Sequence, residues 1–235
     1  MYTLAMDTSN NVLAVAILKN RTVIGEFITN LKKNHSVRLM PAIDLLMEEV
    51  GVESNQLEKI VVAKGPGSYT GVRIGLTTAK TLAWALNVPL IGVSSLESLA
   101  YQTRFYNGLI CPFFDARRGM VYIGGYEWNQ NKMSKTLEET NILMTDWLDI
   151  LVKQNKEVLF LSPDIGQYKE LIKEKMGQLA IIPEDSFHIA KASDLAFAGE
   201  HHAAVSPHVL TPNYLRMAEA EAKWKQAQEE RENNG

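Results

Sequence analysis

Three short apolar runs separated by polar turns open the chain. They span residues 2–8, 12–18 and 22–28, and asparagines or basic residues at 10–11 and 19–21 divide them. Runs of this length bounded by turn residues are typical of strands, and such short turns join antiparallel neighbours. The sequence therefore predicts a three-stranded antiparallel meander at the N-terminus.

Helical and extended patterns alternate after this meander. Apolar residues at three-to-four spacing predict helices over 36–51 and 71–87, and a further helix beginning at 94. Apolar runs predict strands at 59–65 and 89–93. The order of elements is then strand, strand, strand, helix, strand, helix, strand.

The same order returns after residue 105. A second meander is expected from strands at 109–116 and 120–129 and a weaker strand near 132–137. Helices follow at 145–154, with Thr145 as N-cap, 165–177 and 192–203, and strands at 157–162 and 178–183. The repetition predicts two α/β halves of one topology, residues 1–102 and 103–235, although a mixed chain can also be divided this way by chance.

The last residues, 213–235, are rich in alanine, glutamate, lysine and glutamine. These residues favour helix. A C-terminal helix is expected, with Leu215 and Trp224 as its anchors.

Composition narrows the class of protein. The chain has 235 residues, a net charge of −3 and 46% apolar residues, which is typical of a globular protein without a global basic field. Neither a signal peptide nor an apolar run of the roughly 20 residues that span a bilayer is visible. The single cysteine, Cys111, lies in an apolar run and is expected in the core. A cytoplasmic location is expected.

An aspartate ends the first strand of each half, Asp7 in "AMDTSN" and Asp115 in "FFDARRG". Two such halves match the actin/Hsp70-like (ASKHA) fold of actin, sugar kinases and Hsp70, built from two ribonuclease-H-like units. In that fold the two aspartate hairpins bind the phosphates of ATP, which requires small residues at the points of close approach. Asp7, Thr8, Ser9 and Asp115 are therefore candidate nucleotide-binding residues.

A complete nucleotide site is not expected, because "DTSNN" contains no glycine and "DARRG" places two arginines at the close-approach positions. Arg117 and Arg118 are expected at a solvated hairpin tip, in contact with another chain, or on an anion.

The histidines and serines do not form a catalytic pattern. His35 is followed four positions later by Leu39, and His201 and His202 are adjacent, so no helical pair of metal ligands is present. Ser68 in "GPGSYTG" lacks the spacing of a G-x-S-x-G nucleophile elbow. Neither a metal site nor a catalytic residue is predicted.

Six motifs in order carry a resemblance to a known family. They are "MDTSN…VAIL", "HS…LMPAIDLLM", "VAKGPGSYTGVRIGLTTAKTLA", "VSSLESLA", "DARRG.VY" and "P.YLR". Together they are very similar to the bacterial TsaB family, also called YeaZ. The resemblance runs from Met1 to about Trp224 and is most specific over residues 60–100.

The resemblance implies a non-catalytic relative of TsaD, the transferase that makes N6-threonylcarbamoyladenosine (t6A) in tRNA. The expected partners are TsaD and the ATPase subunit TsaE. When the chain is alone, a homodimer is expected. Contact with tRNA is expected only through the complex. No cofactor is expected, and ATP is expected to bind only at a composite site that the chain forms with its partners. The alternatives are a metallopeptidase, after the family's older glycoprotease label, or an ATP-dependent small-molecule enzyme of the same fold.

The family pairs through two helices of its N-terminal half, and the sequence offers a physical basis for this. Gly75, Ala79 and Ala83 form a stripe of small residues that would let two backbones approach closely, and methionines suit adaptable contact surfaces. The expected interface comprises Leu39, Met40, Ile43, Met47, Ile74, Gly75, Thr78, Ala79, Leu82 and Ala83. The glycine-rich turn before the second helix is expected to present Ser68, Tyr69, Thr70 and Arg73 at the mouth of a cleft.

Overall fold

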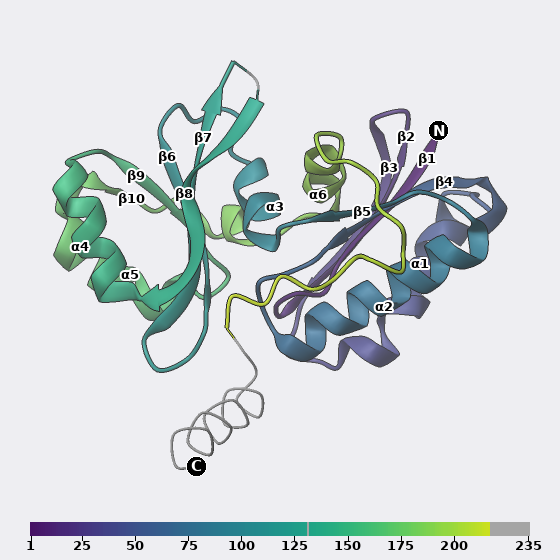
Figure 1. Cartoon of the computed structure of the whole chain (residues 1–235), viewed down its shortest axis with the longest axis horizontal. Coiled ribbons are helices and arrows are strands. Elements are labelled where there is room, and N and C mark those ends of the chain that lie inside the picture. The colour runs from purple at the N-terminus through teal and green to yellow at the C-terminus, as the bar shows by residue number, and fades with distance from the viewer. Residues whose placement is uncertain (131, 217–235) are drawn as a thin grey trace, which may run out of the picture.

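Two five-stranded mixed sheets form the framework of the computed structural model, which describes residues 1–130 and 132–216 (Figure 1). The first sheet has the order β3-β2-β1-β4-β5. Strand β2 runs antiparallel to both of its neighbours, β1 and β3, whereas β4 and β5 run parallel to β1. Its strands are β1 (Tyr2–Asp7), β2 (Val12–Lys19), β3 (Thr22–Asn30), β4 (Leu57–Ala63) and β5 (Leu90–Val93). The predicted N-terminal meander is confirmed.

The second sheet repeats this topology, with the order β10-β9-β6-β7-β8. Its strands are β6 (Leu109–Asp115), β7 (Met120–Asn129), β8 (Lys132–Leu143), β9 (Val158–Leu161) and β10 (Ala180–Ile181). Two meander-led α/β units in one chain confirm the predicted fold class. The predicted third strand of this half was too short, because β8 stays paired with β7 as far as Leu143 opposite Met120.

Helices cover the outer face of each sheet. They are α1 (Leu39–Glu49) and α2 (Tyr69–Leu86) on the first sheet, and α4 (Met144–Gln154) and α5 (Ile165–Met176) on the second. Helix α4 begins directly after β8, so its N-cap is Leu143 and the prediction of Thr145 as N-cap was wrong. Short 3₁₀ turns stand at His35–Val37, Ser54–Gln56, Gly177–Leu179 and Asp185–His188.

Two short helices cross between the sheets. Helix α3 (Ser95–Tyr101) packs on β6 and β7 of the second sheet, and α6 (Ala192–Gly199) packs on the first sheet. The chain then stays beside the first sheet, where Val205 N donates to Leu90 O and Asn213 N donates to Lys64 O. Part of the predicted C-terminal half therefore completes the N-terminal sheet.

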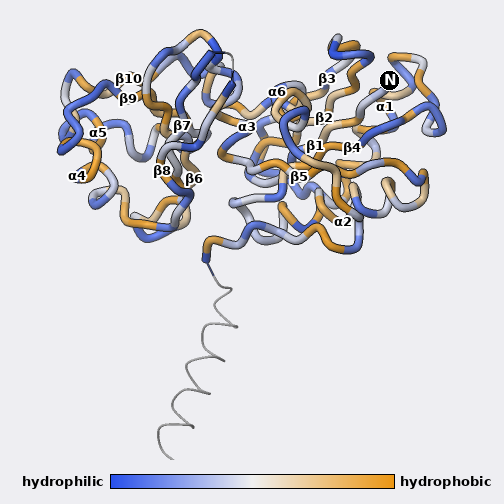
Figure 2. The backbone as a smooth tube through the Cα atoms, turned by 45° about the horizontal axis from the view of Figure 1, so that its top comes forward, coloured by the Kyte–Doolittle hydropathy of each residue, from blue (hydrophilic) through white to orange (hydrophobic). Residues whose placement is uncertain are grey.

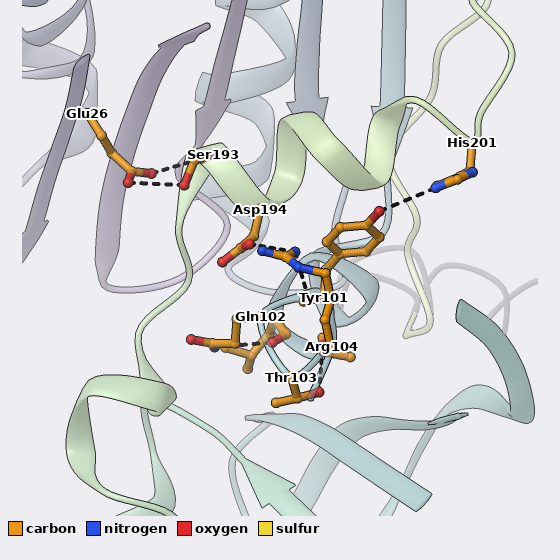
Figure 3. Close-up of polar contacts among 10 residues, drawn as sticks. Glu26, Tyr101, Gln102, Thr103, Arg104, Ser193, Asp194 and His201 are labelled. Carbon is orange, nitrogen blue, oxygen red and sulfur yellow. Dashed lines mark hydrogen bonds and ion pairs between the residues drawn. The ribbon is translucent and has the colours of Figure 1, made fainter. Parts of the chain in front are cut away.

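Polar contacts hold this crossing together (Figure 3). Arg104, just after α3, donates to the buried carboxylate of Asp194 in α6 at 2.9 Å. Burial raises the pKa of Asp194, and the charge of Arg104 opposes that rise. Glu26 of β3 accepts hydrogen bonds from the backbone and hydroxyl of Ser193. Arg104 thus ties the end of α3 to α6, and Glu26 ties α6 to β3.

Apolar residues concentrate in the central strands of both sheets, and polar residues in the connecting turns (Figure 2). Cys111 is fully buried, as predicted, and burial raises the pKa of its thiol to about 12. No helix among the described residues is long and apolar enough to cross a membrane. The predicted C-terminal helix and its anchor Trp224 lie outside the described residues, whereas Leu215 is described and half-buried.

Candidate functional site

The glycine-rich turn between β4 and α2 packs against the first aspartate hairpin. Ser68 N donates to Ser9 O at 2.7 Å, and Thr8 Oγ1 donates to Gly71 O at 2.8 Å. A Cβ on Gly67 would lie 2.1 Å from Ser9 O, and one on Gly71 would lie 2.2 Å from Thr8 O. The glycines therefore allow a close approach between two backbone segments of this chain, where a phosphate cradle would leave open space.

This packing encloses the candidate nucleotide-binding residues of the first aspartate hairpin. Asp7, Thr8 and Ser9 are at most 1% exposed. Asp7 Oδ1 accepts a hydrogen bond from Ser9 N, and burial raises the pKa of Asp7, whose Oδ2 has no hydrogen-bond partner among the described residues. These groups present no accessible polar surface to a phosphate, so the geometry disfavours the predicted role for this hairpin.

The second candidate, Asp115, is half-buried and engaged within its own half. Its Oδ1 accepts hydrogen bonds from Tyr168 Oη at 2.6 Å and from Arg117 N at 3.2 Å. Asp164 lies beside it and accepts from Asp115 N at 3.0 Å. Burial raises the pKa of Asp164, and the charge of Asp115 adds to this rise. Two neighbouring carboxylates form a poor surface for an anion.

The predicted cleft-loop side chains are all exposed. Ser68 caps α2, since its Oγ accepts a hydrogen bond from Gly71 N. Tyr69 and Arg73 extend outward from the first turns of α2 and contact Tyr214 near the end of the described chain. The turn thus places an aromatic and a cationic side chain on the surface.

The predicted stripe of small residues faces inward. Ala79 and Ala83 are at most 1% exposed, and a Cβ on Gly75 would lie 2.6 Å from Thr8 Oγ1. Leu39 and Ile43 of α1 are equally buried against the sheet. These five residues pack on the chain's own strands, so their prediction as direct interface residues was wrong. The small side chains bring α2 close to its sheet.

The outer surface of the same two helices carries exposed apolar side chains. Met40, Leu45 and Trp84 are 46%, 56% and 68% exposed, and Val37 just before α1 is 68% exposed. The predicted residues Met47, Ile74, Thr78 and Leu82 of the same helices are half-buried. We call the set Val37, Met40, Leu45, Met47, Ile74, Thr78, Leu82 and Trp84 the docking face. The sequence analysis missed Val37, Leu45 and Trp84. The one feature of the sequence that could have indicated them is that these apolar residues fall outside the periodic positions that are buried.

Comparison with known proteins identifies the family. A family model described as "TsaD: tRNA N6-adenosine threonylcarbamoyltransferase" matches residues 22–224. A Bacillus subtilis protein named tRNA threonylcarbamoyladenosine biosynthesis protein TsaB is 49% identical over 228 residues, covering 97% of this chain and 100% of the relative. This chain belongs to the TsaB family.

Further TsaB relatives agree over nearly the full length. The Haemophilus influenzae protein of the same name is 36% identical, covering 94% of this chain and 95% of the relative. The structure of YeaZ from Pseudomonas aeruginosa aligns with a TM-score of 0.75 and 27% identity, covering 91% of this chain and 99% of YeaZ. The resemblance inferred from the six motifs is confirmed.

His35 of this TsaB-family chain makes a contact within the fold. His35 Nε2 contacts Asn10 O at 2.7 Å, and Leu39, four positions later, is buried in the core. Within residues 1–130 and 132–216, no three His, Cys, Asp or Glu side chains are grouped so that they could hold a metal ion.

A cavity of about 540 Å³ lies between the halves on the side of β5 and β8. Its carboxylates are bonded within the chain, since Glu97 contacts His202 Nε2 at 2.8 Å and Glu139 accepts from Asn213 Nδ2 at 2.8 Å. Tyr126 Oη also donates to Glu139. The cavity therefore contains an internal polar network that links the C-terminal segment to both halves.

Proposed function

We propose that this chain is a non-catalytic scaffold subunit of a complex that synthesises t6A in tRNA. The observation that carries the proposal is the 49% identity, over nearly the full length of both chains, to a protein named for threonylcarbamoyladenosine biosynthesis. A transferase subunit of the TsaD type is the catalytic partner, an ATPase of the TsaE type completes the complex, and the complex works in the cytoplasm.

The chemistry of the chain supports a non-catalytic role. His35, in the 3₁₀ turn before α1, is followed four positions later by Leu39, where a second helical metal ligand would stand, and Asp7 is enclosed by the chain itself. On this proposal the chain holds no cofactor of its own, and ATP binds only at a site shared with partners.

The docking face supports pairing through α1 and α2. Exposed aromatic and aliphatic side chains on two adjacent helices are the usual anchors of a helix-to-helix interface, and a buried tryptophan at such an interface contributes about 2 kcal/mol or more. The same face would join two copies of this chain when the catalytic partner is absent. Trp84, with 68% of its surface exposed, is the natural anchor.

Reconstitution tests the function directly. The catalytic subunit, the ATPase, the enzyme that supplies threonylcarbamoyl-adenylate, and tRNA are combined with and without this chain, and t6A is measured by mass spectrometry of nucleosides. We expect product only with the chain present. Equal product without it contradicts the proposal.

A pair of variants tests the docking face. Trp84→Ser removes an exposed aromatic from the face, and Phe105→Ser removes an equally exposed aromatic (68%) that lies beyond α3. We expect Trp84→Ser to weaken binding to the catalytic partner at least 30-fold, about 2 kcal/mol, while Phe105→Ser binds like the wild type. Equal binding by all three proteins, measured by calorimetry, overturns the assignment of this face.

A further inference from the structure

A stacked aromatic pair with a guanidinium group lies on the surface where α2 begins. The rings of Tyr69 and Tyr214 stack with centroids 5.1 Å apart and 23° between their planes, and they remain 44% and 41% exposed. The guanidinium of Arg73 lies 4.1 Å from the Tyr69 centroid, and its Nε donates to Tyr214 Oη at 2.7 Å. Residues 141 positions apart thus form one pre-ordered platform.

More arginines extend this platform toward the second half. Two positions beyond Tyr214, Arg216 donates to Ala116 O at 3.3 Å, which brings it to the β6–β7 hairpin. The tip of that hairpin exposes Arg117 and Arg118. In Figure 1 the end of the described segment passes from the first half toward the second beside the start of α2. We call Tyr69, Arg73, Arg117, Arg118, Tyr214 and Arg216 the arginine–tyrosine face.

Four arginines lie on this face, and the half-buried carboxylate of Asp115 belongs to the same hairpin as two of them. Arg73, Arg117 and Arg216 form no ion pair with another described residue, whereas Arg104 and Arg21 are paired with Asp194 and Glu200. The whole chain has a net charge of −3. A concentration of guanidinium groups on an acidic protein indicates an anionic partner at this place.

The tyrosines decide which anionic partner fits. Arginines alone would suit an acidic protein or a phosphate, but exposed aromatic rings also offer π-faces on which unpaired bases stack. Single-stranded segments of RNA combine such bases with a phosphate backbone, and guanidinium groups both stack and bind phosphate. Because Arg73 already holds Tyr214 in place, little side-chain entropy remains to be lost on binding.

We propose that the arginine–tyrosine face binds an unpaired segment of the tRNA that the catalytic partner modifies. The inference rests on the proposed function and adds a direct RNA contact by this chain. Helix α2 carries the platform at its first turns and Trp84 near its end, 15 residues or about 22 Å away. One helix thus carries residues of both surfaces, which adjoin at Arg73 and Ile74, and places RNA beside the docked catalytic subunit.

The test measures RNA binding by fluorescence anisotropy, with labelled substrate tRNA and its isolated anticodon stem-loop. The variants are Arg73→Gln, Arg117→Gln and Tyr214→Ala, and the control is Arg21→Gln, an exposed arginine on the β2–β3 turn. Tyr214→Phe retains the ring and serves as the conservative variant. Each protein is measured alone and saturated with catalytic subunit, at two salt concentrations.

We expect Tyr214→Ala to weaken RNA binding between about 5-fold and 150-fold, the range for loss of one stacked base. Arg117→Gln is expected to lower the slope of log affinity against log salt by about 0.7, the value for one single-stranded phosphate contact. Tyr214→Phe keeps the stacking ring but loses the hydrogen bond from Arg73, so it is expected to weaken binding less than Tyr214→Ala does. Arg21→Gln is expected to bind like the wild type.

Three outcomes overturn the inference. If the face variants bind RNA as tightly as Arg21→Gln, alone and in the complex, or if the wild type binds none in either state, this face is not an RNA site. If instead the variants lose affinity for the catalytic subunit but keep RNA binding, the face is a protein contact. Binding by the chain alone needs no partner, so its result stands apart from the reconstitution that tests the proposed function.

Discussion

Gly71 occupies a place where any side chain would collide with the backbone of the first aspartate hairpin. It lies in the first turn of α2, and a Cβ there would stand 2.2 Å from Thr8 O. Ordinary contact begins at 3.4 Å, so Gly71→Ala must push the two segments apart by about 1.2 Å. The movement strains the hydrogen bonds Thr8 Oγ1 to Gly71 O and Ser68 N to Ser9 O.

The magnitude follows from the groups involved. Each strained hydrogen bond contributes about 1 kcal/mol, and forcing a methyl group into a packed site costs about 1–3 kcal/mol. Alanine in place of glycine within a helix stabilises the folded state by about 0.5–1 kcal/mol, which offsets part of this loss. We expect Gly71→Ala to lower the free energy of unfolding by about 2–4 kcal/mol, which corresponds to a urea midpoint about 1–2 M lower.

Urea unfolding followed by tryptophan fluorescence measures this change, and Gly166→Ala is the matched control. Gly166 also lies in the first turn of a helix, α5, but a Cβ there would meet no atom within 4 Å. We expect this variant to be as stable as the wild type or more stable by up to about 1 kcal/mol. If Gly71→Ala behaves like Gly166→Ala, the close contact between turn and hairpin does not exist.

Three further predictions concern buried groups. The raised pKa of Asp7 means that the folded state holds the proton more tightly, so the wild type loses stability as pH rises from the ordinary value of 3.8 through the raised one. Asp7→Asn should lack this loss, and parallel pH profiles of the free energy of unfolding would contradict the reasoning. Cys111, with a pKa of about 12, should resist iodoacetamide at pH 8 until the chain is unfolded in urea, as mass spectrometry can show. Ala79→Arg should lower the free energy of unfolding by about 3–5 kcal/mol, because it buries an unpaired charge. Thr77→Arg, on the exposed side of α2, should change it by no more than about 0.5 kcal/mol. Equal melting temperatures for the two variants would refute this orientation of α2.

The order of elements could be predicted because hydrophobic periodicity is a local property. Apolar runs bounded by turn residues indicated both meanders, three-to-four spacing indicated the helices, and the aspartates that end β1 and β6 indicated the repeat. The predicted end of β8 was wrong. Many residues of this strand are polar, and they remain extended because β7 pairs with them. The true start of α4 at Met144 follows from that pairing, which no local signal encodes.

The sequence by itself determined the fold class and the family, since both depend on motifs and periodicities that are read along the chain. Tertiary structure alone decided which side of α2 is available to a partner. A stripe such as Gly75, Ala79 and Ala83 permits close approach to a second helix or to a sheet equally well, and only the contact with β1 and β4 shows that it faces inward. The pairing of Tyr69 with Tyr214 was likewise invisible in sequence, because chain folding alone brings residues so far apart into contact.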